Sequence, residues 1–239
     1  MHTHLESVPE LIDINGQQFY LITDVDQMAP FLIAVVSSSD HWMYISSSGG
    51  LSAGRVNAQH SLFPYRTDDL LHEIHGFSGP WTGIRVGETL WEPLHGRSTP
   101  GCSRNLARST AGDQLCIEEH HHELGLTLQS VWGFSERSGF VRTMTLTHSA
   151  EHTEPITAEL ADGLRDLVAG GAPLSAMSSM SCLINAYTRT DLIGSRLATI
   201  TMESALSDVA EPAESLYANR VTCDAPSKER AACHFKMSC

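Results

Sequence analysis

The sequence lacks several features that would assign it to a function class directly. Its six cysteines contain no Cys-x-x-Cys pair, which excludes the usual zinc and thiol-redox motifs. Basic residues are scarce, 15 against 28 acidic ones, and the net charge of −13 opposes attraction to nucleic acid or anionic membranes. No apolar run is as long as a membrane helix, and the amino terminus has no secretory pattern. We therefore expect a soluble, cytoplasmic protein with no nucleic-acid or membrane partner.

Hydrophobic patterning predicts a mainly β protein with long loops and one or two short helices. Asn15 and Gly16 separate two apolar runs, as in a tight β-hairpin, and a β-meander is expected between residues 114 and 148. Short helices are predicted over residues 68–74 and 176–187. The expected strands cover residues 11–14, 17–22, 31–36, 42–46, 81–86, 89–91, 114–124, 127–134, 140–148, 156–160, 197–202 and 215–221. The rest of residues 51–112 is predicted to be mostly loop, and such length favours a binding surface.

The length of 239 residues is compatible with one domain, because all-β units of this size are common as single domains. We expect one β-sandwich over residues 1–222, incomplete by itself. Residues 223–239 have no apolar period and are expected to form an irregular tail, where the reading frame of a longer protein is cut short. Cys116, Cys182 and the apolar stripe along residues 176–187 are expected in the core.

The most informative segment is the stretch over residues 41–69. It joins a short predicted strand to a glycine-rich loop, and it combines a cation, aromatic rings, hydroxyls and carboxylates with glycines that let a ligand approach the backbone. This pattern predicts a polar-ligand site, in which an aromatic ring stacks on a sugar. The predicted ligand-binding residues are Trp42, Ser47, Gly49, Gly50, Arg55, Tyr65, Asp68 and Asp69.

A nucleotide or catalytic site is a weaker interpretation of the same stretch. Gly49 and Gly54 have the spacing of a phosphate-binding loop, but Arg55 and Val56 stand where that loop requires Lys and then Ser or Thr. Asp68 is expected to cap a helix that begins near residue 69, and no Gly-x-Ser-x-Gly elbow occurs. We therefore predict neither a catalytic residue nor a cofactor.

A histidine-rich stretch leaves a metal site open as an alternative. On a strand, Glu118, His120 and His122 share one face, so the two histidines could bind one metal ion in a small β-barrel enzyme. The run supplies no third ligand, and Leu126 occupies the glutamate position of the cupin pattern. A solvated or partly paired strand face is the preferred interpretation.

Several blocks of the sequence resemble one family of large bacterial proteins. Residues 42–55, WMYISSSGGLSAGR, and residues 62–69, LFPYRTDD, are similar to the start of cellobiose-phosphorylase-like proteins. The blocks ELADGLRDL at 159–167 and AEPAESL at 210–216 are similar to later parts of the same proteins. The resemblance covers much of residues 42–216.

The resemblance implies a β-supersandwich of the galactose-mutarotase-like type, which in those proteins precedes a helical barrel that carries the catalytic carboxylates. It also implies that this chain is a non-catalytic, carbohydrate-associated domain that helps to line a site for a carbohydrate or a sugar phosphate. Its partner would be the missing helical catalytic domain. A ligand-free scaffold or a homo-oligomer is the remaining alternative.

Overall fold

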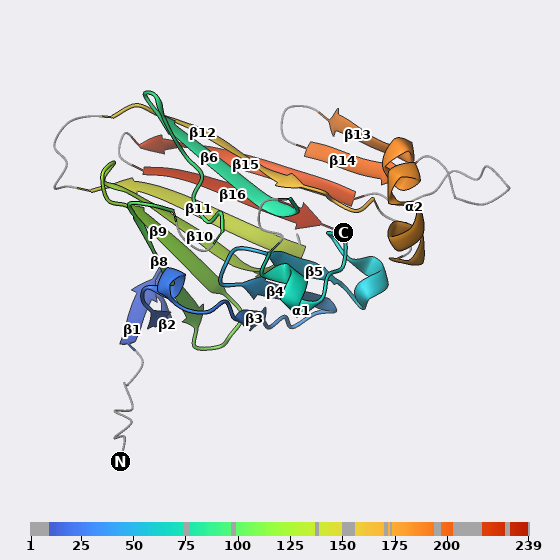
Figure 1. Ribbon diagram of the computed structural model, residues 1–239, viewed down its shortest axis with the longest axis horizontal. Helices are drawn as coiled ribbons and strands as arrows, with labels where there is room; N and C mark the ends of the chain where they lie inside the picture. Colours follow the sequence, from blue (N-terminus) through green and yellow to red (C-terminus); the bar gives the residue numbers. More distant parts are fainter. Residues whose placement is uncertain are drawn as a thin grey trace, which may run out of the picture.

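The computed structural model of the chain shows a β-sandwich-like arrangement (Figure 1). It describes residues 10–73, 77–96, 99–136, 139–149, 156–169, 172, 174–193, 197–202, 217–227 and 230–238. Three antiparallel sheets make up this part of the chain, and none of them closes into a barrel there. The prediction of a mainly β protein with one or two short helices is confirmed.

One sheet has ten strands and the other two have three each. The large sheet has the order β1-β2-β8-β9-β10-β11-β16-β15-β14-β13. Its strands are β1 (Glu10–Ile14), β2 (Gln17–Ile22), β8 (Cys102–Ser109), β9 (Leu115–His121), β10 (Leu126–Ser135), β11 (Gly139–His148), β13 (Thr188–Ile193), β14 (Leu197–Met202), β15 (Tyr217–Ser227) and β16 (Arg230–Ser238). The small sheets are β3 (Leu32–Val35), β4 (His41–Ser46) and β5 (Leu51–Arg55), and β12 (Ala158–Arg165), β6 (Gly79–Val86) and β7 (Thr89–Trp91).

The helices are short. They are α1 (Asp68–Leu71), α2 (Leu174–Tyr187) and the 3-10 turns η1 (Val25–Gln27) and η2 (Ala58–His60). None of the helices in the described part is long and apolar enough to cross a membrane.

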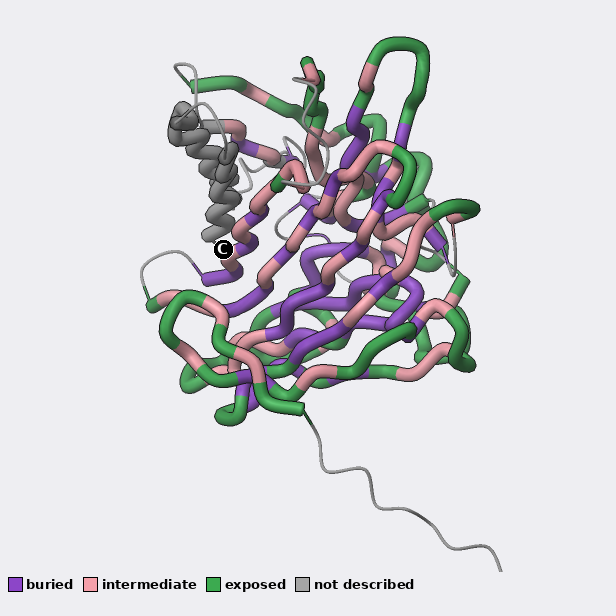
Figure 2. The backbone as a smooth tube through the Cα atoms, turned by 90° about the vertical axis from the view of Figure 1, so that its left-hand side faces the viewer, coloured by how far each residue is buried: buried purple, intermediate pink, exposed green. Residues whose placement is uncertain are grey.

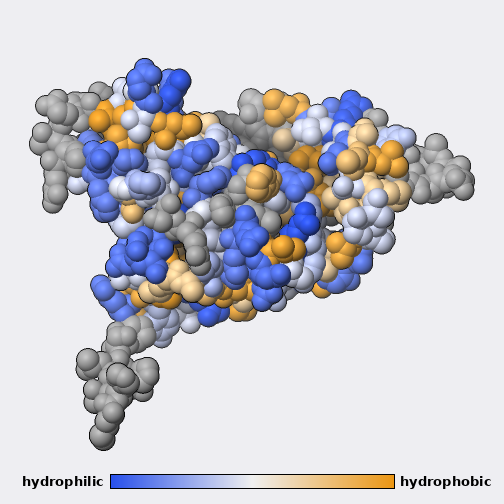
Figure 3. Space-filling view, in the orientation of Figure 1, coloured by the Kyte–Doolittle hydropathy of each residue, from blue (hydrophilic) through white to orange (hydrophobic). Residues whose placement is uncertain are grey.

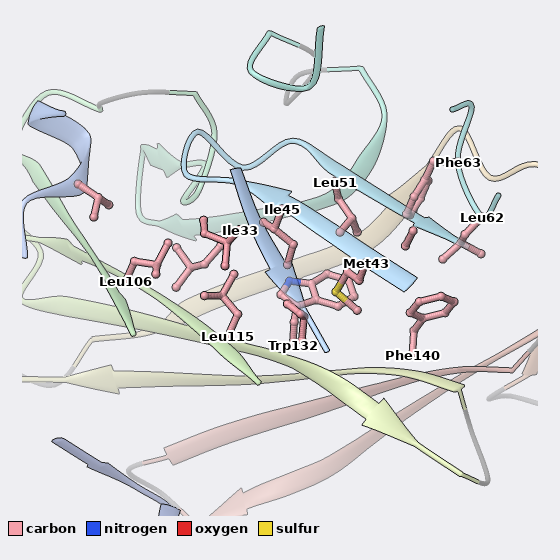
Figure 4. Packing of buried hydrophobic residues seen from close by; sticks show 14 residues of the cluster. Ile33, Met43, Ile45, Leu51, Leu62, Phe63, Leu106, Leu115, Trp132 and Phe140 are labelled. Carbon is pink, nitrogen blue, oxygen red and sulfur yellow. The ribbon is translucent and has the colours of Figure 1, made fainter. Parts of the chain in front are cut away.

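The two small sheets cover the same face of the ten-stranded sheet. Met43 of β4 packs in one cluster with Leu115 and Trp132 of the large sheet (Figure 4). Ile84 of β6 packs in a second cluster with Leu128 of β10. Buried stretches accordingly run through the middle of the molecule (Figure 2). The hydrophobic core therefore lies between the two layers, as the sandwich prediction requires.

Turn chemistry and strand alternation explain the predicted hairpins. β1 and β2 pair through Asn15 and Gly16, whose φ angles of 55° and 84° fit a two-residue turn. β9, β10 and β11 pair in sequence as the predicted meander. In β10, Leu126, Leu128 and Trp132 are buried in the core, as alternation requires.

Two strands lie in the segment predicted to be mostly loop. β5 pairs with β4, and β8 pairs with β9. β5 reads Leu-Ser-Ala-Gly-Arg, in which small residues have weak strand preference, and β8 turns Arg104 into the interior, which disrupts the apolar alternation. The loop prediction is therefore wrong over residues 51–55 and 102–109.

The carboxyl-terminal part also differs from the prediction. β15 continues past residue 222 to Ser227, and β16 pairs with both β11 and β15. These strands belong to the ten-stranded sheet, where an irregular tail over residues 223–239 was expected. The block at 210–216 and Cys239 lie outside the described residues.

Helix α2 confirms the predicted helix over residues 176–187 but only part of its predicted core face. Ala176 and Ile184 are buried, whereas Met180, Leu183 and Tyr187 are 39%, 42% and 44% exposed. The backbone departs from helical angles at Met180, so the apolar side chains before and after this residue do not share one stripe.

The two cysteines expected in the core differ from each other. Cys116 is buried in a cluster with Phe19 and Ala107, and burial raises the pKa of its thiol to about 12. Cys182 on α2 is exposed, which contradicts the prediction. The helix turns this side chain away from the buried Ala176 and Ile184.

Candidate functional site

The turn between β4 and β5 holds three of the predicted ligand-binding residues. Ser47 is buried, and its hydroxyl accepts a hydrogen bond from the Phe31 N–H at 3.1 Å. Gly49 has a φ of 100°, a left-handed conformation that favours glycine. A Cβ atom at Gly50 would overlap the carbonyl oxygen of Leu71, so α1 packs directly on this turn. These three residues are therefore engaged in holding the turn.

A buried ion pair anchors the same turn to the large sheet. The Arg104 guanidinium binds Glu119 at 2.7 Å, and both side chains are 1% exposed. Arg104 Nη1 also donates to the carbonyls of Ser47 and Gly96, at 3.1 and 2.6 Å. Glu119 accepts further hydrogen bonds from the Trp91 indole and the Leu94 N–H. The pair is thus hydrogen-bonded on all sides, which is what a buried charge requires.

Arg55 lies apart from the predicted aromatic residues. Its Nε donates to both carboxylate oxygens of Asp40, at 3.0 and 2.9 Å, and this contact holds the pKa of Asp40 below its ordinary value. In the β4–β5 register Arg55 is opposite His41, on the face that carries Met43 into the core. Trp42 points to the other face. Arg55 and Trp42 therefore do not converge on one ligand.

Asp68 and Asp69 form the first turn of α1. Thr67 is the N-cap and the helix begins at Asp68, one residue before the predicted start. Asp68 Oδ1 accepts a hydrogen bond from the Asp69 N–H at 3.0 Å, and a hydrogen bond from Thr67 lowers the pKa of Asp69. Carboxylates at this end of a helix stabilise it through the helix dipole. The structure explains both residues without a ligand.

Two of the predicted residues do come together, with a third aromatic beside them. The ring of Trp42 lies 6.1 Å from that of Tyr65 and 6.1 Å from that of Tyr44, measured between centroids. Gly54 leaves room for the Trp42 ring, because a Cβ there would overlap it. Tyr65 is 43% exposed and Tyr44 is 41% exposed. The outer face of the small sheet β3-β4-β5 therefore carries an exposed aromatic surface.

Tyr65 also lies on a polar groove between the segment after η2 and helix α2. The groove has a volume of about 380 Å³. Polar and charged groups make up most of its lining, with three apolar side chains among them. The lining residues are Pro64, Tyr65, Arg66, Asp166, Leu174, Met177, Ser178, Ser181 and Asn185. We call this the Tyr65 groove.

Hydrogen bonds between distant segments hold the walls of the Tyr65 groove. The Leu174 N–H, at the start of α2, donates to the side chain of Gln59 in η2 at 2.8 Å. The Val168 N–H donates to the carbonyl of Leu62 at 2.9 Å. Beneath α2, Ile184 packs in a buried apolar cluster with Val168. The groove is therefore formed by the packing of residues 59–66 against residues 166–185.

The groove carries one charge of each sign. Removal of water from around the carboxyl group raises the pKa of Asp166, and the positive charge of Arg66 acts in the opposite direction. Asp166 has a φ of 59°, a conformation that Asp and Asn tolerate better than most residues. Among the described residues that line the groove, Asp166 is the only carboxylate. The groove thus offers donors and acceptors with little net charge.

The histidine-rich stretch forms the predicted face only in part, because Glu118 and His120 share it and His122 does not. His120 Nε2 hydrogen-bonds Glu118 at 2.7 Å and its Nδ1 hydrogen-bonds Thr127 at 2.8 Å, so both ring nitrogens have partners. β9 ends at His121, which places His122 beyond the strand. The described part of the chain contains no group of three side chains able to hold a metal ion, and its sheets form no closed barrel. The metal-dependent β-barrel alternative is therefore not favoured.

No protein-family model matches this sequence, and no curated protein matches it. Of the predicted residues, the structure brings together Trp42 and Tyr65. Arg66, Asp166 and Asn185 were not predicted to bind a ligand. Arg66 is adjacent to a predicted residue, but Asp166 and Asn185 are about a hundred positions away in sequence, and no local pattern connects them to Tyr65.

Proposed function

We propose that this chain is a non-catalytic, carbohydrate-binding β-sandwich domain that holds a sugar in the Tyr65 groove. The observation that carries the proposal is an exposed tyrosine ring, backed by Trp42, at the rim of a polar groove of about 380 Å³. Sugar rings bind through an apolar face and a rim of hydroxyls, so an aromatic ring beside mixed donors and acceptors suits them. The resemblance to cellobiose-phosphorylase-like proteins supports the same ligand class.

The polar lining supports a role for hydroxyl recognition. Arg66 supplies only donors, Asp166 supplies acceptors when ionised, and Asn185 supplies both. Two neighbouring hydroxyl groups of a sugar can accept hydrogen bonds from Arg66 and donate hydrogen bonds to Asp166. A groove with one cation and one anion therefore favours a neutral sugar over a sugar phosphate.

The carboxylate count supports binding without hydrolysis. Glycoside hydrolysis usually requires a pair of carboxyl groups, one on each side of the scissile bond. Asp166 is the single carboxylate among the described groove residues, and Asp68 and Asp69 lie in the first turn of α1. We therefore propose that any reaction on the sugar is performed by a helical catalytic domain outside this chain.

Titration calorimetry tests the proposal. Cellobiose, longer β-1,4-linked glucose oligomers and glucose 1-phosphate are titrated into the wild-type chain, with heat expected from the neutral sugars. Tyr65→Ala is expected to weaken binding about five- to thirtyfold, because a stacked ring contributes on the order of 1–2 kcal/mol. Tyr20→Ala is the matched control, since Tyr20 on β2 is 45% exposed and remote from the groove lining. Heat unaffected by Tyr65→Ala, or no heat with any sugar, would refute the proposal.

A second variant tests the polar part of the groove. Asp166→Asn keeps the size of the side chain and its tolerance of positive φ, and removes the charge. We expect it to weaken sugar binding while leaving the fold intact. Asp13→Asn, at an exposed position of β1 beside the turn into β2, provides a charge-matched control.

A further inference from the structure

β13 is the last strand of the ten-stranded sheet, and one of its two edges is open in the described part of the chain. It pairs with β14 over all six of its residues without a register shift. Natural proteins commonly blunt such an edge with proline, a bulge or a covering segment. The β13 sequence, TRTDLI, contains neither proline nor glycine. The edge of β13 that faces away from β14 can therefore pair with another strand.

Exposed apolar side chains surround this edge. Leu192 and Ile193 of β13 are 69% and 57% exposed, and Leu183 and Tyr187 of the adjoining helix are 42% and 44% exposed. Apolar atoms are visible at the right-hand end of the molecule (Figure 3), where α2 and β13 lie in Figure 1. Grouped apolar exposure at a strand edge is typical of a contact surface.

The charged side chains of β13 are arranged so that two copies of the strand, related by a two-fold axis, bring opposite charges together. Arg189 and Asp191 lie on one face of the strand and form an ion pair at 2.9 Å, with about half of each side chain exposed. Two antiparallel copies of β13 related by an axis at Thr190 place Arg189 of each copy opposite Asp191 of the other. A shift of the axis to Arg189 or to Asp191 brings like charges together, which is unfavourable across a strand pair. Of these three registers, the one centred on Thr190 is therefore favoured.

We propose that the chain forms a homodimer through antiparallel pairing of β13 with β13 of a second copy, with the two-fold axis at Thr190. The ten-stranded sheet of one copy then continues into that of the other. Thr188 of each copy lies opposite Leu192 of its partner strand, and residue 187 lies opposite residue 193, which covers part of the exposed apolar surface. A second copy fits this edge because the same short segment supplies both charges in the required order.

Light scattering coupled to size-exclusion chromatography tests the dimer on the full chain. The wild-type protein is expected at twice the chain mass of 26.1 kDa, with dissociation on dilution. Arg189→Glu and Asp191→Lys each oppose like charges at both crossing points, so each is expected to raise the dimer dissociation constant at least about tenfold. Circular dichroism of each variant confirms that the fold is kept.

Two further experiments, mixing the two single variants and exchanging the two charges within one chain, make the test specific for the proposed register. An equimolar mixture of Arg189→Glu and Asp191→Lys is expected to form a heterodimer, because the acidic strand then meets the basic one. The double variant Arg189→Asp with Asp191→Arg is expected to recover the wild-type dimer. Three outcomes overturn the proposal: a monomeric wild type at all concentrations up to about 1 mM, an open polymer from head-to-tail pairing with β1, or a dimer that neither single variant weakens.

Discussion

The two ends of the segment 46–69 were predicted to serve one ligand site, but they have opposite roles. The first end, Ser47 to Gly50, packs against α1 and receives the buried Arg104 side chain. The second end, around Tyr65, lies on the surface and opens onto a groove. Serine and glycine occur wherever backbone groups approach closely, whether the approaching group is a ligand or another part of the chain. What separates the two ends is the contact that distant residues make with each.

The largest effect on stability is expected from breaking the buried ion pair between Arg104 and Glu119, which holds the first end of the segment. Glu119→Ala leaves the Arg104 guanidinium uncompensated inside the sandwich, so we expect the free energy of unfolding to fall by about 3–5 kcal/mol. Urea denaturation measures this change. Glu159→Ala, which breaks an exposed ion pair with Arg85, is the control and is expected to change stability little. Equal effects of the two substitutions would mean that Arg104 does not anchor the turn.

A methyl group added at Gly50 tests the contact between the turn and α1. The Cβ atom would overlap the carbonyl oxygen of Leu71, a backbone atom that cannot rotate away. We expect Gly50→Ala to reduce stability by roughly 1–3 kcal/mol. Gly163→Ala is the matched control, because no atom lies within 4 Å of the added Cβ there. Thermal denaturation of both variants should separate them, and a neutral Gly50→Ala would contradict the close packing.

Glu118 is the neighbour of Glu119 on β9, and its side chain points to the opposite face of the sheet. Its hydrogen bond with His120 lowers the pKa of Glu118 to about 2 and raises that of His120. The stabilisation through Glu118 is full above the ordinary carboxyl pKa of 4.5 and is lost as pH falls toward 2. The stabilisation through His120 is full below the ordinary histidine pKa of 6.5 and is lost as pH rises through the raised value.

Because these two pH dependences oppose each other, the stabilisation by the Glu118–His120 pair is expected to pass through a maximum as pH changes. The difference in unfolding free energy between wild type and Glu118→Gln should be largest between pH 4.5 and 6.5. We expect about 1–2 kcal/mol there, since water screens this partly exposed pair. Urea titrations at several pH values measure it. A difference that is constant from pH 3 to pH 9 would show that the pair does not form.

The smallest effect on stability is expected at Tyr65. Its side chain is 43% exposed, so Tyr65→Ala should change the free energy of unfolding by less than about 1 kcal/mol. Phe63, two residues earlier, is 1% exposed, and Phe63→Ala should cost about 3–5 kcal/mol. Denaturation of both variants checks the contrast. A large loss at Tyr65 would make this residue part of the core.

Local patterns predicted much of the fold, but of the residues that line the groove they singled out only Tyr65. The Asn15-Gly16 turn and the alternation of β10 were readable because each depends on neighbouring residues. β8 was not, since its inward Arg104 is tolerated only because Glu119 lies opposite on β9. The groove shows the same limit: Trp42 and Tyr65 stand in one segment, whereas Asp166 and Asn185 reach it only through the packing of α2.

The proposed sugar site is tested by comparing two of the predicted ligand-binding residues, Tyr65 and Arg55, in one titration. Cellobiose and its longer oligomers are titrated into Tyr65→Ala and into Arg55→Ala, with folding of both variants checked by circular dichroism. We predict that Tyr65→Ala weakens sugar binding about five- to thirtyfold, whereas Arg55→Ala, which removes a guanidinium that contacts Asp40 and does not line the groove, binds as the wild type does. Binding that survives Tyr65→Ala and disappears with Arg55→Ala would contradict this prediction.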